Sequence, residues 1–321
     1  MNMLAATLQP FRFREGCHLV FVDGELQSEL SDALPAGLSW QQGVLQVQAH
    51  QHILVPVHIL HWATKVNVPH YHCKVILQSG SQLAITQSFL ANSDTKALFT
   101  LVSDYQVADQ ARLQIDQLQA SQVGVAEKVT AHVKKQGHFG VTQFSQGALV
   151  DQHQMHVFLD EEGADCRLLT LAAVQKGCKV EHDTLIEHLA PHTTTEQVVK
   201  SIVADTAQSV FAGMIHVHKA AQKTVAKQLN QNLLMSEKSV ANARPQLRIE
   251  ADDVKCSHGA TVGQINPESL FYLQSRGIPK NEALPMLMLG FAEDIVAKFH
   301  NTELKQKLHA SLQHNFFKEF L

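Results

Sequence analysis

The sequence is poor in charge, in paired cysteines and in long apolar runs. Asp, Glu, Lys and Arg make up 17% of the 321 residues, and the formal net charge is -4. A usual globular protein has roughly 25% charged residues, so there is little electrostatic basis for binding nucleic acid or an anionic membrane. No apolar run reaches the ~18 residues of a membrane span, and Met1–Leu8 lacks the basic flank of a signal peptide. We therefore expect neither nucleic acid nor a membrane as partner.

Several chemical motifs are absent as well. The five cysteines are an odd number and none forms a Cys-x-x-Cys pair, which argues against a disulfide framework and for a reducing, cytoplasmic location. The sequence contains no phosphate-binding Gly-x-x-x-x-Gly-Lys-Ser/Thr loop, no Gly-x-Ser-x-Gly elbow and no dinucleotide fingerprint. Without the phosphate-binding loop, we expect that the chain is not itself a P-loop ATPase.

What the sequence does contain, from Cys17 onward, is a series of short apolar strands. Their centres follow one another at intervals of roughly 10–15 residues, which is typical of a sandwich, barrel or solenoid. Asp109–Val133 is rich in Gln and Ala and has some helical spacing, but Gly124 and the β-branched residues oppose a helix. We predict strands there too. Periodicity alone does not distinguish a sandwich from a solenoid.

Near residue 265 the pattern changes to helical. Asn266 can cap a helix that starts at Pro267, and Gly277 fits its left-handed C-terminal cap. A helical segment after Gly263 is expected to cover one open end of a stack of strands. We divide the chain into an N-terminal segment (1–16), a β-region (17–264) and a helical subdomain (265–321).

The helical subdomain has more apolar surface than three short helices need. One stripe at helical spacing consists of Leu284, Met288, Phe291, Ile295 and Phe299. A further helix is predicted from about Thr302. The final residues, Phe316–Leu321, are apolar and are expected to dock on the domain or on a partner. Most of these side chains are expected to pack on one another, with some left for another protein.

The junction between the two patterns carries the most informative residues. Leu247, Ile249 and Ala251 alternate with polar residues, as in a half-buried strand. Cys256 and His258 follow at a spacing of two, which places both side chains on one face of an extended chain. Thiolate and imidazole are ligands that iron–sulfur clusters use. Two donors cannot complete a four-ligand site, so a partner would supply the rest; alternatively, Cys256 is a buried core thiol.

Asp252–Gly263 and Leu270–Ile278 together resemble the SufB/SufD family of iron–sulfur cluster assembly proteins, on the SufD side. A SufB-like sequence typically has Glu after the histidine, where this chain has Gly259. The resemblance extends over about 193–298 and implies a right-handed parallel β-helix with a C-terminal helical subdomain. Family members usually have a helical N-terminal domain before the β-region, whereas strand patterns begin here at about Cys17.

The resemblance also implies a function without catalytic turnover. The chain would be a scaffold subunit of a SUF complex, with His258 facing a cysteine of a SufB-like subunit where a nascent cluster forms, and with Cys256 less central. A transient iron–sulfur cluster or iron would be shared with that partner, and the isolated chain would have no tightly bound cofactor. A homodimer is the alternative when the SufB-like subunit is absent. A SufC-like ATPase would bind Ser269–Phe299, with contacts at Phe271, Arg276, Gly277, Leu287, Phe291 and Ile295.

Two other readings compete with the scaffold. His70 and His72 form a His-x-His pair, as in a metal-dependent, cupin-like β-barrel enzyme, although no suitable carboxylate follows. The pairs His153/His156 and His216/His218 are similar, but close pairs arise by chance among 20 histidines. A β-solenoid that binds or cleaves polysaccharide is the third hypothesis. It would need an export signal and a charged cluster on one strand face, and the sequence shows neither.

Overall fold

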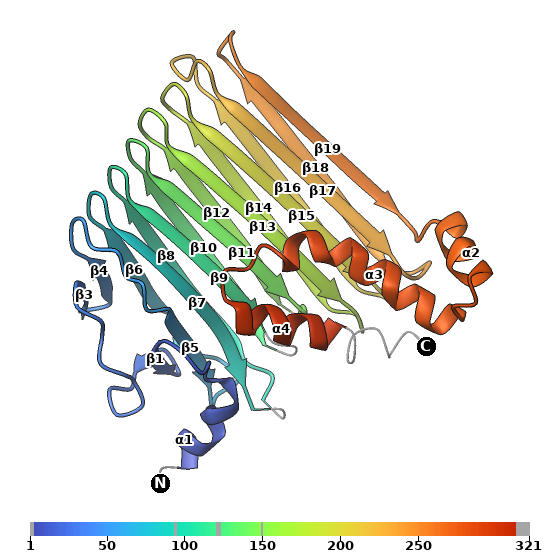
Figure 1. Cartoon of the computed structure of the whole chain (residues 1–321), viewed down its shortest axis with the longest axis horizontal. Coiled ribbons are helices and arrows are strands. Elements are labelled where there is room, and N and C mark those ends of the chain that lie inside the picture. Colours follow the sequence, from blue (N-terminus) through green and yellow to red (C-terminus); the bar gives the residue numbers. More distant parts are fainter. Residues whose placement is uncertain (1–2, 93–94, 120–122, 149, 313–321) are drawn as a thin grey trace.

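The computed structural model describes residues 3–92, 95–119, 123–148 and 150–312. In these residues the chain winds into a parallel β-solenoid of about 7 turns, followed by C-terminal helices (Figure 1). The mainly β fold and the helical C-terminal part are confirmed. The predicted docking segment Phe316–Leu321 lies outside the described residues.

From β4 onward, successive strands alternate between two sheets, so each turn of the solenoid gives one strand to each sheet. Apart from the antiparallel pairs β1–β2 and β3–β4, neighbouring strands pair in parallel. In spatial order, sheet A consists of β19 (Lys255–Gly263), β17 (Val225–Leu234), β15 (Thr194–Val203), β13 (Asp165–Val174), β11 (His138–Ser145), β9 (Arg112–Gln119), β7 (Gln82–Ala91), β5 (Val57–Ala63), β1 (Cys17–Val22) and β2 (Glu25–Leu26). Sheet B consists of β18 (Val240–Ile249), β16 (Gln208–Val217), β14 (Lys179–His188), β12 (Asp151–Leu159), β10 (Gly124–Val133), β8 (Leu98–Val107), β6 (Tyr71–Leu77), β4 (Val44–Val47) and β3 (Leu38–Gln41).

The main hydrophobic core lies between the two sheets. Ile115, Val141 and Leu168 stack in register on sheet A, and Ile186 and Ile215 do so on sheet B. All five belong to one buried cluster. Period-2 alternation places every second side chain inside, which explains why the strand pattern was readable from sequence. The strand prediction for 109–133 is confirmed by β9 and β10.

Five helical elements complete the described chain. α1 (Met3–Leu8) and a 3-10 turn, η1 (Gln9–Phe11), precede β1, and α2 (Pro267–Ser275), α3 (Lys280–Val296) and α4 (Thr302–Ser311) follow β19. Asn266 caps α2 as predicted, because its Oδ1 accepts from the Glu268 N–H at 2.8 Å, and Gly277 has the predicted positive φ of 84°. None of the described helices combines the length and the apolar character needed to cross a bilayer.

The predicted helical cover over the end of the stack is wrong. α3 and α4 run back across the outer face of sheet A, while β18 and β19 stay at the open end (Figure 1). The reason is a second apolar surface on sheet A, where Leu171 and Ile202 pack with Met288 and Ile295 of α3. Covering this face removes apolar side chains from water, whereas a strand edge presents mainly backbone groups. The last turn of the solenoid therefore keeps a free edge.

Polar anchors fix the helices on sheet A. Asp116 on β9 is 1% exposed and accepts the N–H groups of His300 and Asn301 at 2.7 and 2.8 Å. Lys200 on β15 is 4% exposed, and its Nζ donates to the Phe291 carbonyl at 3.1 Å and to Asp294 Oδ2 at 2.5 Å. These contacts tie α3 and the start of α4 to particular strands.

Replacing Lys200 with alanine should lower the free energy of unfolding by about 1–3 kcal/mol, because a buried hydrogen-bonded charge is lost and the Phe291 carbonyl loses its side-chain donor. Urea unfolding measures the change. Lys227→Ala is the matched control, since Lys227 is an exposed lysine on the next strand of the same sheet, and it should change stability by less than about 0.5 kcal/mol. Equal effects of the two substitutions would contradict the anchor.

Candidate functional site

The open end of the solenoid is formed by the last strand of each sheet. β18 and β19 are the outermost strands of sheets B and A, so each presents a row of backbone groups without a neighbouring strand. Apolar side chains are exposed along this end, with Val240 41%, Ile249 43% and Val262 48% exposed. A long, partly apolar pair of edges of this kind is suited to pairing with another chain.

Cys256 and His258 both lie on β19, on the face that continues the solenoid interior. They pair in register with Ala226 and Gln228, whose side chains are buried inside. A spacing of two residues in a strand separates their Cα atoms by about 6.6–6.8 Å. The two side chains therefore share a face, as predicted, at the place where the interior meets the open end.

The two side chains differ in accessibility. His258 is exposed, whereas Cys256 is half-buried and packs against the main core. Burial raises the pKa of the Cys256 thiol, and a hydrogen bond with the Ala226 backbone only partly opposes this. In the isolated chain the imidazole of His258 is thus the available donor, while the thiol is the poorer ligand because it stays protonated.

A row of buried amides lies behind His258. Gln228 Nε2 donates to Gln197 Oε1 at 2.8 Å, and Gln197 Nε2 donates to Thr184 Oγ1 at 2.9 Å. The Gln228 Oε1 atom is buried and has no hydrogen-bond partner among the described residues. At Gly213 an added Cβ would lie 2.6 Å from Gln228 Nε2, so the glycine leaves room for this amide. β17, the strand that pairs with β19, is consequently held in place by this row of buried amides.

The residues predicted to contact an ATPase fall into two groups. Phe271 is 72% exposed on α2, and the Arg276 guanidinium lies 5.2 Å from the centroid of the Tyr272 ring. Leu287 of α3 lines one shallow surface pocket together with Phe271, and Gly277 ends α2 nearby. These four residues surround an exposed surface on α2 and the start of α3.

The other two predicted contacts do not lie on that surface. Ile295 is 2% exposed and packs against sheet A, and Phe291 is half-buried with Lys200 Nζ 4.9 Å from its ring centroid. Phe299, on the same stripe, is 1% exposed. Placing Ile295 among accessible partner contacts was wrong, because the stripe covers this chain's own apolar sheet face.

A network of charged side chains lies inside the solenoid and was not predicted from the sequence. Glu127, Asp151 and His153 are 5%, 1% and 6% exposed and face the interior from β10 and β12. His153 Nε2 lies 2.8 Å from Asp151 Oδ1, and its Nδ1 lies 3.9 Å from Glu127 Oε2. Ser103 donates to Glu127 at 2.6 Å and Ser145 donates to Asp151 at 2.6 Å. Both buried carboxylates thus have partners.

Burial by itself would lower the pKa of His153. The charge and hydrogen bond of Asp151, together with Glu127, outweigh that effect and raise the pKa to about 9. Burial would likewise raise the pKa of Glu127, but hydrogen bonding and charge from His153 lower it overall. The network is therefore an imidazolium between two carboxylates, and it joins the two sheets internally.

The predicted histidine pairs have different outcomes. His70 and His72 are exposed, and His72 Nε2 lies 2.7 Å from Asp104 Oδ2. They lie on a solenoid rather than a barrel, which does not favour the cupin-like reading. His153 faces the interior, whereas His156 is on the alternate, outer face of the same strand.

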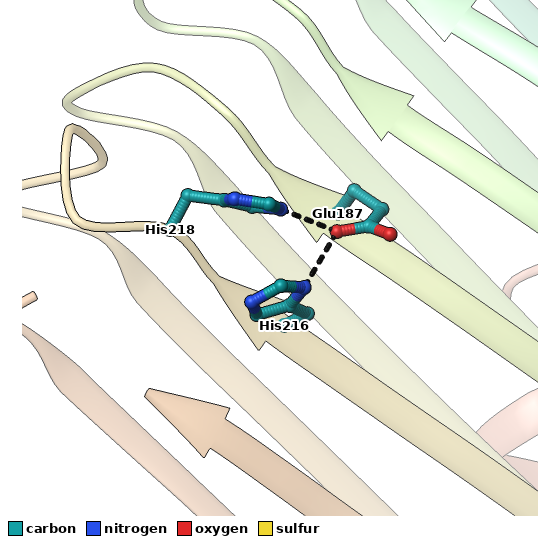
Figure 2. Close-up of side chains that lie close together, drawn as sticks. All are labelled: Glu187, His216 and His218. Atoms are coloured by element: carbon teal, nitrogen blue, oxygen red, sulfur yellow. Dashed lines mark hydrogen bonds and ion pairs between the residues drawn. The ribbon is translucent and has the colours of Figure 1, made fainter. Parts of the chain in front are cut away.

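His216 and His218 lie beside a third potential metal ligand, the carboxylate of Glu187. Figure 2 shows the two imidazoles next to one another, both directed at the same oxygen of the Glu187 carboxylate. Among the described residues, Glu187, His216 and His218 are the set of three His, Cys, Asp or Glu side chains whose donor atoms lie close enough together to hold a metal ion. The contact of Glu187 with these histidines was not predicted, because Glu187 lies one solenoid turn before His216, its register partner.

Comparison with known proteins agrees with this architecture. The family described as "SUF system FeS cluster assembly, SufBD core domain" matches residues 61–291. Iron-sulfur cluster assembly protein SufD of Escherichia coli (strain K12) is 31% identical over an alignment of 361 positions, gaps included, which covers 97% of this chain and 80% of that protein. SufD of Bacillus subtilis (strain 168) is 26% identical over 74% of this chain and 55% of its own length. Protein ABCI7, chloroplastic, of Arabidopsis thaliana is 29% identical over 73% of this chain and 50% of its own length.

The family match covers most of the solenoid and reaches into α3, and the Escherichia coli relative matches nearly the whole chain. The residues matched by the family include all of β19, with Cys256 and His258. The chain belongs to the SufB/SufD family of iron–sulfur cluster assembly proteins and, within that family, is most like SufD.

Proposed function

We propose that this chain is a non-catalytic, SufD-like scaffold subunit that presents His258 at a seam shared with a SufB-like subunit. The observation that carries the proposal is the position of His258, exposed on the interior face of the last strand of sheet A. The nascent iron–sulfur cluster is the cargo of this seam. The chain offers an imidazole and a half-buried thiol there, so the second subunit supplies the remaining ligands.

The open edges support the choice of partner. A second β-solenoid of the same family would have matching strands, and it could continue both sheets from β18 and β19. Such pairing would satisfy the free backbone groups and bury Val240, Ile249 and Val262. It would also enclose His258 between two interiors, where water is partly excluded. A homodimer formed through the same edges is the competing arrangement.

The exposed surface on α2 is the proposed docking site for a SufC-like ATPase. This chain has no nucleotide-binding loop, so any ATP-driven movement must come from a partner. α2 follows directly after β19, since only Gln264, Ile265 and Asn266 lie between the end of the strand at Gly263 and the start of the helix at Pro267. A pull on α2 would therefore be transmitted to the strand that carries His258.

Co-expression with SufB-like and SufC-like proteins tests the proposed function. We expect the three chains to purify as one complex, and anaerobic incubation with ferrous iron and sulfide to give a cluster on the complex. The single chain should not hold a stable cluster, because its own donors are too few. A cluster assembled by the single chain, or failure of the chain to bind either protein, would contradict the proposal.

Phe271→Asp should weaken binding of the SufC-like ATPase by about tenfold or more, since exposed aromatic residues at interfaces are often worth more than 1 kcal/mol. Binding of the SufB-like subunit should not change. Val66→Asp is the matched control, because Val66 is 61% exposed but lies between β5 and β6, near the other end of the strand order. Calorimetric titration of each variant measures the affinities, and equal losses in both would contradict docking at α2.

A further inference from the structure

A histidine–carboxylate cluster lies on the outer face of sheet B, apart from β19. Glu187 on β14 pairs in register with His216 on β16, and His218 follows one residue after the end of β16. The His218 backbone N–H donates to the His188 carbonyl at 3.1 Å, which continues the ladder past the strand end. The three side chains therefore project from backbone that is hydrogen-bonded on both strands.

The donor atoms of the cluster converge on one point (Figure 2). Glu187 Oε2 lies 2.8 Å from His216 Nδ1 and 2.6 Å from His218 Nε2. All three donor atoms lie within 4.8 Å of one another. In a tetrahedral site with bonds of about 2.0–2.1 Å, ligand atoms are roughly 3.3 Å apart, so small side-chain rotations would make room for an ion. The side chains are 16%, 11% and 35% exposed in the order Glu187, His216, His218, which leaves a path from solvent.

The surroundings of His216 point to a cation at Nδ1. Its Nδ1 faces Glu187 and its Nε2 lies 3.1 Å from Glu250 Oε1, so both ring nitrogens face carboxylates. A neutral imidazole has only one N–H and would turn a lone pair toward one of them. A metal ion on Nδ1 would leave the single N–H of His216 at Nε2, where it donates to Glu250 Oε1. A carboxylate on the outer nitrogen is the usual support of a metal-binding histidine.

A neighbouring imidazole gives a second observation. His156 Nε2 is buried and has no hydrogen-bond partner among the described residues, although it lies 3.6 Å from Glu187 Oε1. Three imidazoles thus surround one carboxylate. A surface that needed only a salt bridge would require one of them.

We propose that Glu187, His216 and His218 form a binding site for a divalent first-row transition-metal ion, in the range from Fe²⁺ to Zn²⁺. Two imidazoles and one carboxylate are ligands that suit these ions, and three protein ligands leave coordination positions open. On binding, the ion displaces the hydrogen that each imidazole directs at Glu187, so that His216 Nδ1 and His218 Nε2 become ligands. The displaced protons pass to solvent or to the other nitrogen of the same ring, and His216 Nε2–H still donates to Glu250 Oε1. This site is separate from His258, and it does not depend on the proposed cluster function.

Titration of the purified, EDTA-treated full chain tests the site. Zn²⁺ is followed by calorimetry and Co²⁺ by its visible absorption, with ferrous iron added anaerobically as competitor. We expect one ion per chain, displacement of Co²⁺ by Zn²⁺, displacement of Co²⁺ by ferrous iron only when the iron is in excess, and no competition from Mg²⁺ or Ca²⁺, since those two ions prefer oxygen ligands. No binding at millimolar ion, or equal competition by Mg²⁺, would overturn the proposal.

Variants locate the ion. His218→Ala and Glu187→Gln should each weaken Zn²⁺ binding by at least about tenfold, and Glu250→Gln should weaken it by about tenfold through His216. His72→Ala is the matched control, because His72 is an exposed histidine paired with Asp104 on the same sheet. This control should bind as the unchanged chain does. Thermal unfolding confirms that each variant is folded, and loss of binding in His72→Ala, or its retention in His218→Ala, would overturn the assignment.

Discussion

Replacing His258 with alanine should lower iron–sulfur cluster assembly on the three-protein complex by at least about tenfold while leaving the complex intact. The imidazole is exposed on the last strand and lies on the interior face, so its removal takes away the proposed ligand without opening the core. Outer-shell partners of metal ligands are worth about 10–100-fold, and a direct ligand should matter at least as much. Anaerobic reconstitution followed by iron and sulfide analysis measures the loss.

Two control variants make this result specific. His72→Ala removes an exposed histidine elsewhere on the solenoid and should assemble clusters normally. Cys256→Ser should have a smaller effect than His258→Ala, since burial raises the pKa of the Cys256 thiol. Full assembly by His258→Ala would remove this side chain from the mechanism, and a complex that falls apart would show a structural role instead.

The second large effect is expected inside the solenoid. Replacing His153 with leucine should lower the free energy of unfolding by about 3–5 kcal/mol, because Glu127 and Asp151 would remain buried without their cation. The triple variant Glu127→Gln/Asp151→Asn/His153→Leu removes all three charges. It should regain more than half of the loss, since replacing a whole buried ion cluster is often nearly neutral. Urea unfolding of both variants tests this, and a triple variant less stable than the single one would contradict it.

The same network gives the chain a pH dependence. The pKa of His153 is raised from 6.5 to about 9 in the folded chain, so its contribution is complete below about pH 6.5 and is lost as pH rises through about 9. The pKa of Glu127 is lowered from 4.5, so its contribution is present above about pH 4.5 and is lost as pH falls further. Stability should therefore fall between about pH 6.5 and 9 in the unchanged chain. In the triple variant the fall over the same window should be smaller, and equal falls would contradict the network.

Much of the fold could be predicted because the solenoid repeats one local pattern. Alternation such as Leu247, Ile249 and Ala251 marks a strand wherever it occurs, and the caps at Asn266 and Gly277 depend only on nearby residues. The shared face of Cys256 and His258 also follows from local geometry. The prediction of parallel stacking, in contrast, came from the family resemblance, because the period of the sequence pattern does not distinguish a sandwich from a solenoid.

Contacts between turns could not be predicted from local pattern. Glu127 and His153 are a full turn apart in sequence and become neighbours only through strand register. A strand with polar residues on both faces does not reveal which face is inside, so buried charges look like surface charges. The same reason hid Glu187 from its partner His216.

The helical subdomain shows a different limit. The stripe containing Ile295 was recognised correctly as apolar, but an apolar stripe does not say whether it meets its own domain or a partner. Sheet A carries a second apolar face, at Leu171 and Ile202, that the strand alternation did not reveal. That face, rather than the open strand edge, determines where α3 lies.

Amide hydrogen exchange of the chain, alone and bound to the SufB-like subunit, tests the seam most directly. Binding of the SufB-like subunit should slow amide exchange in the two edge strands, Val240–Ile249 and Lys255–Gly263. The slowing there should be far greater than in Leu38–Gln41, at the other end of sheet B. Unchanged exchange in both edge strands, with protection elsewhere on the solenoid, would contradict the placement of His258 between two subunits.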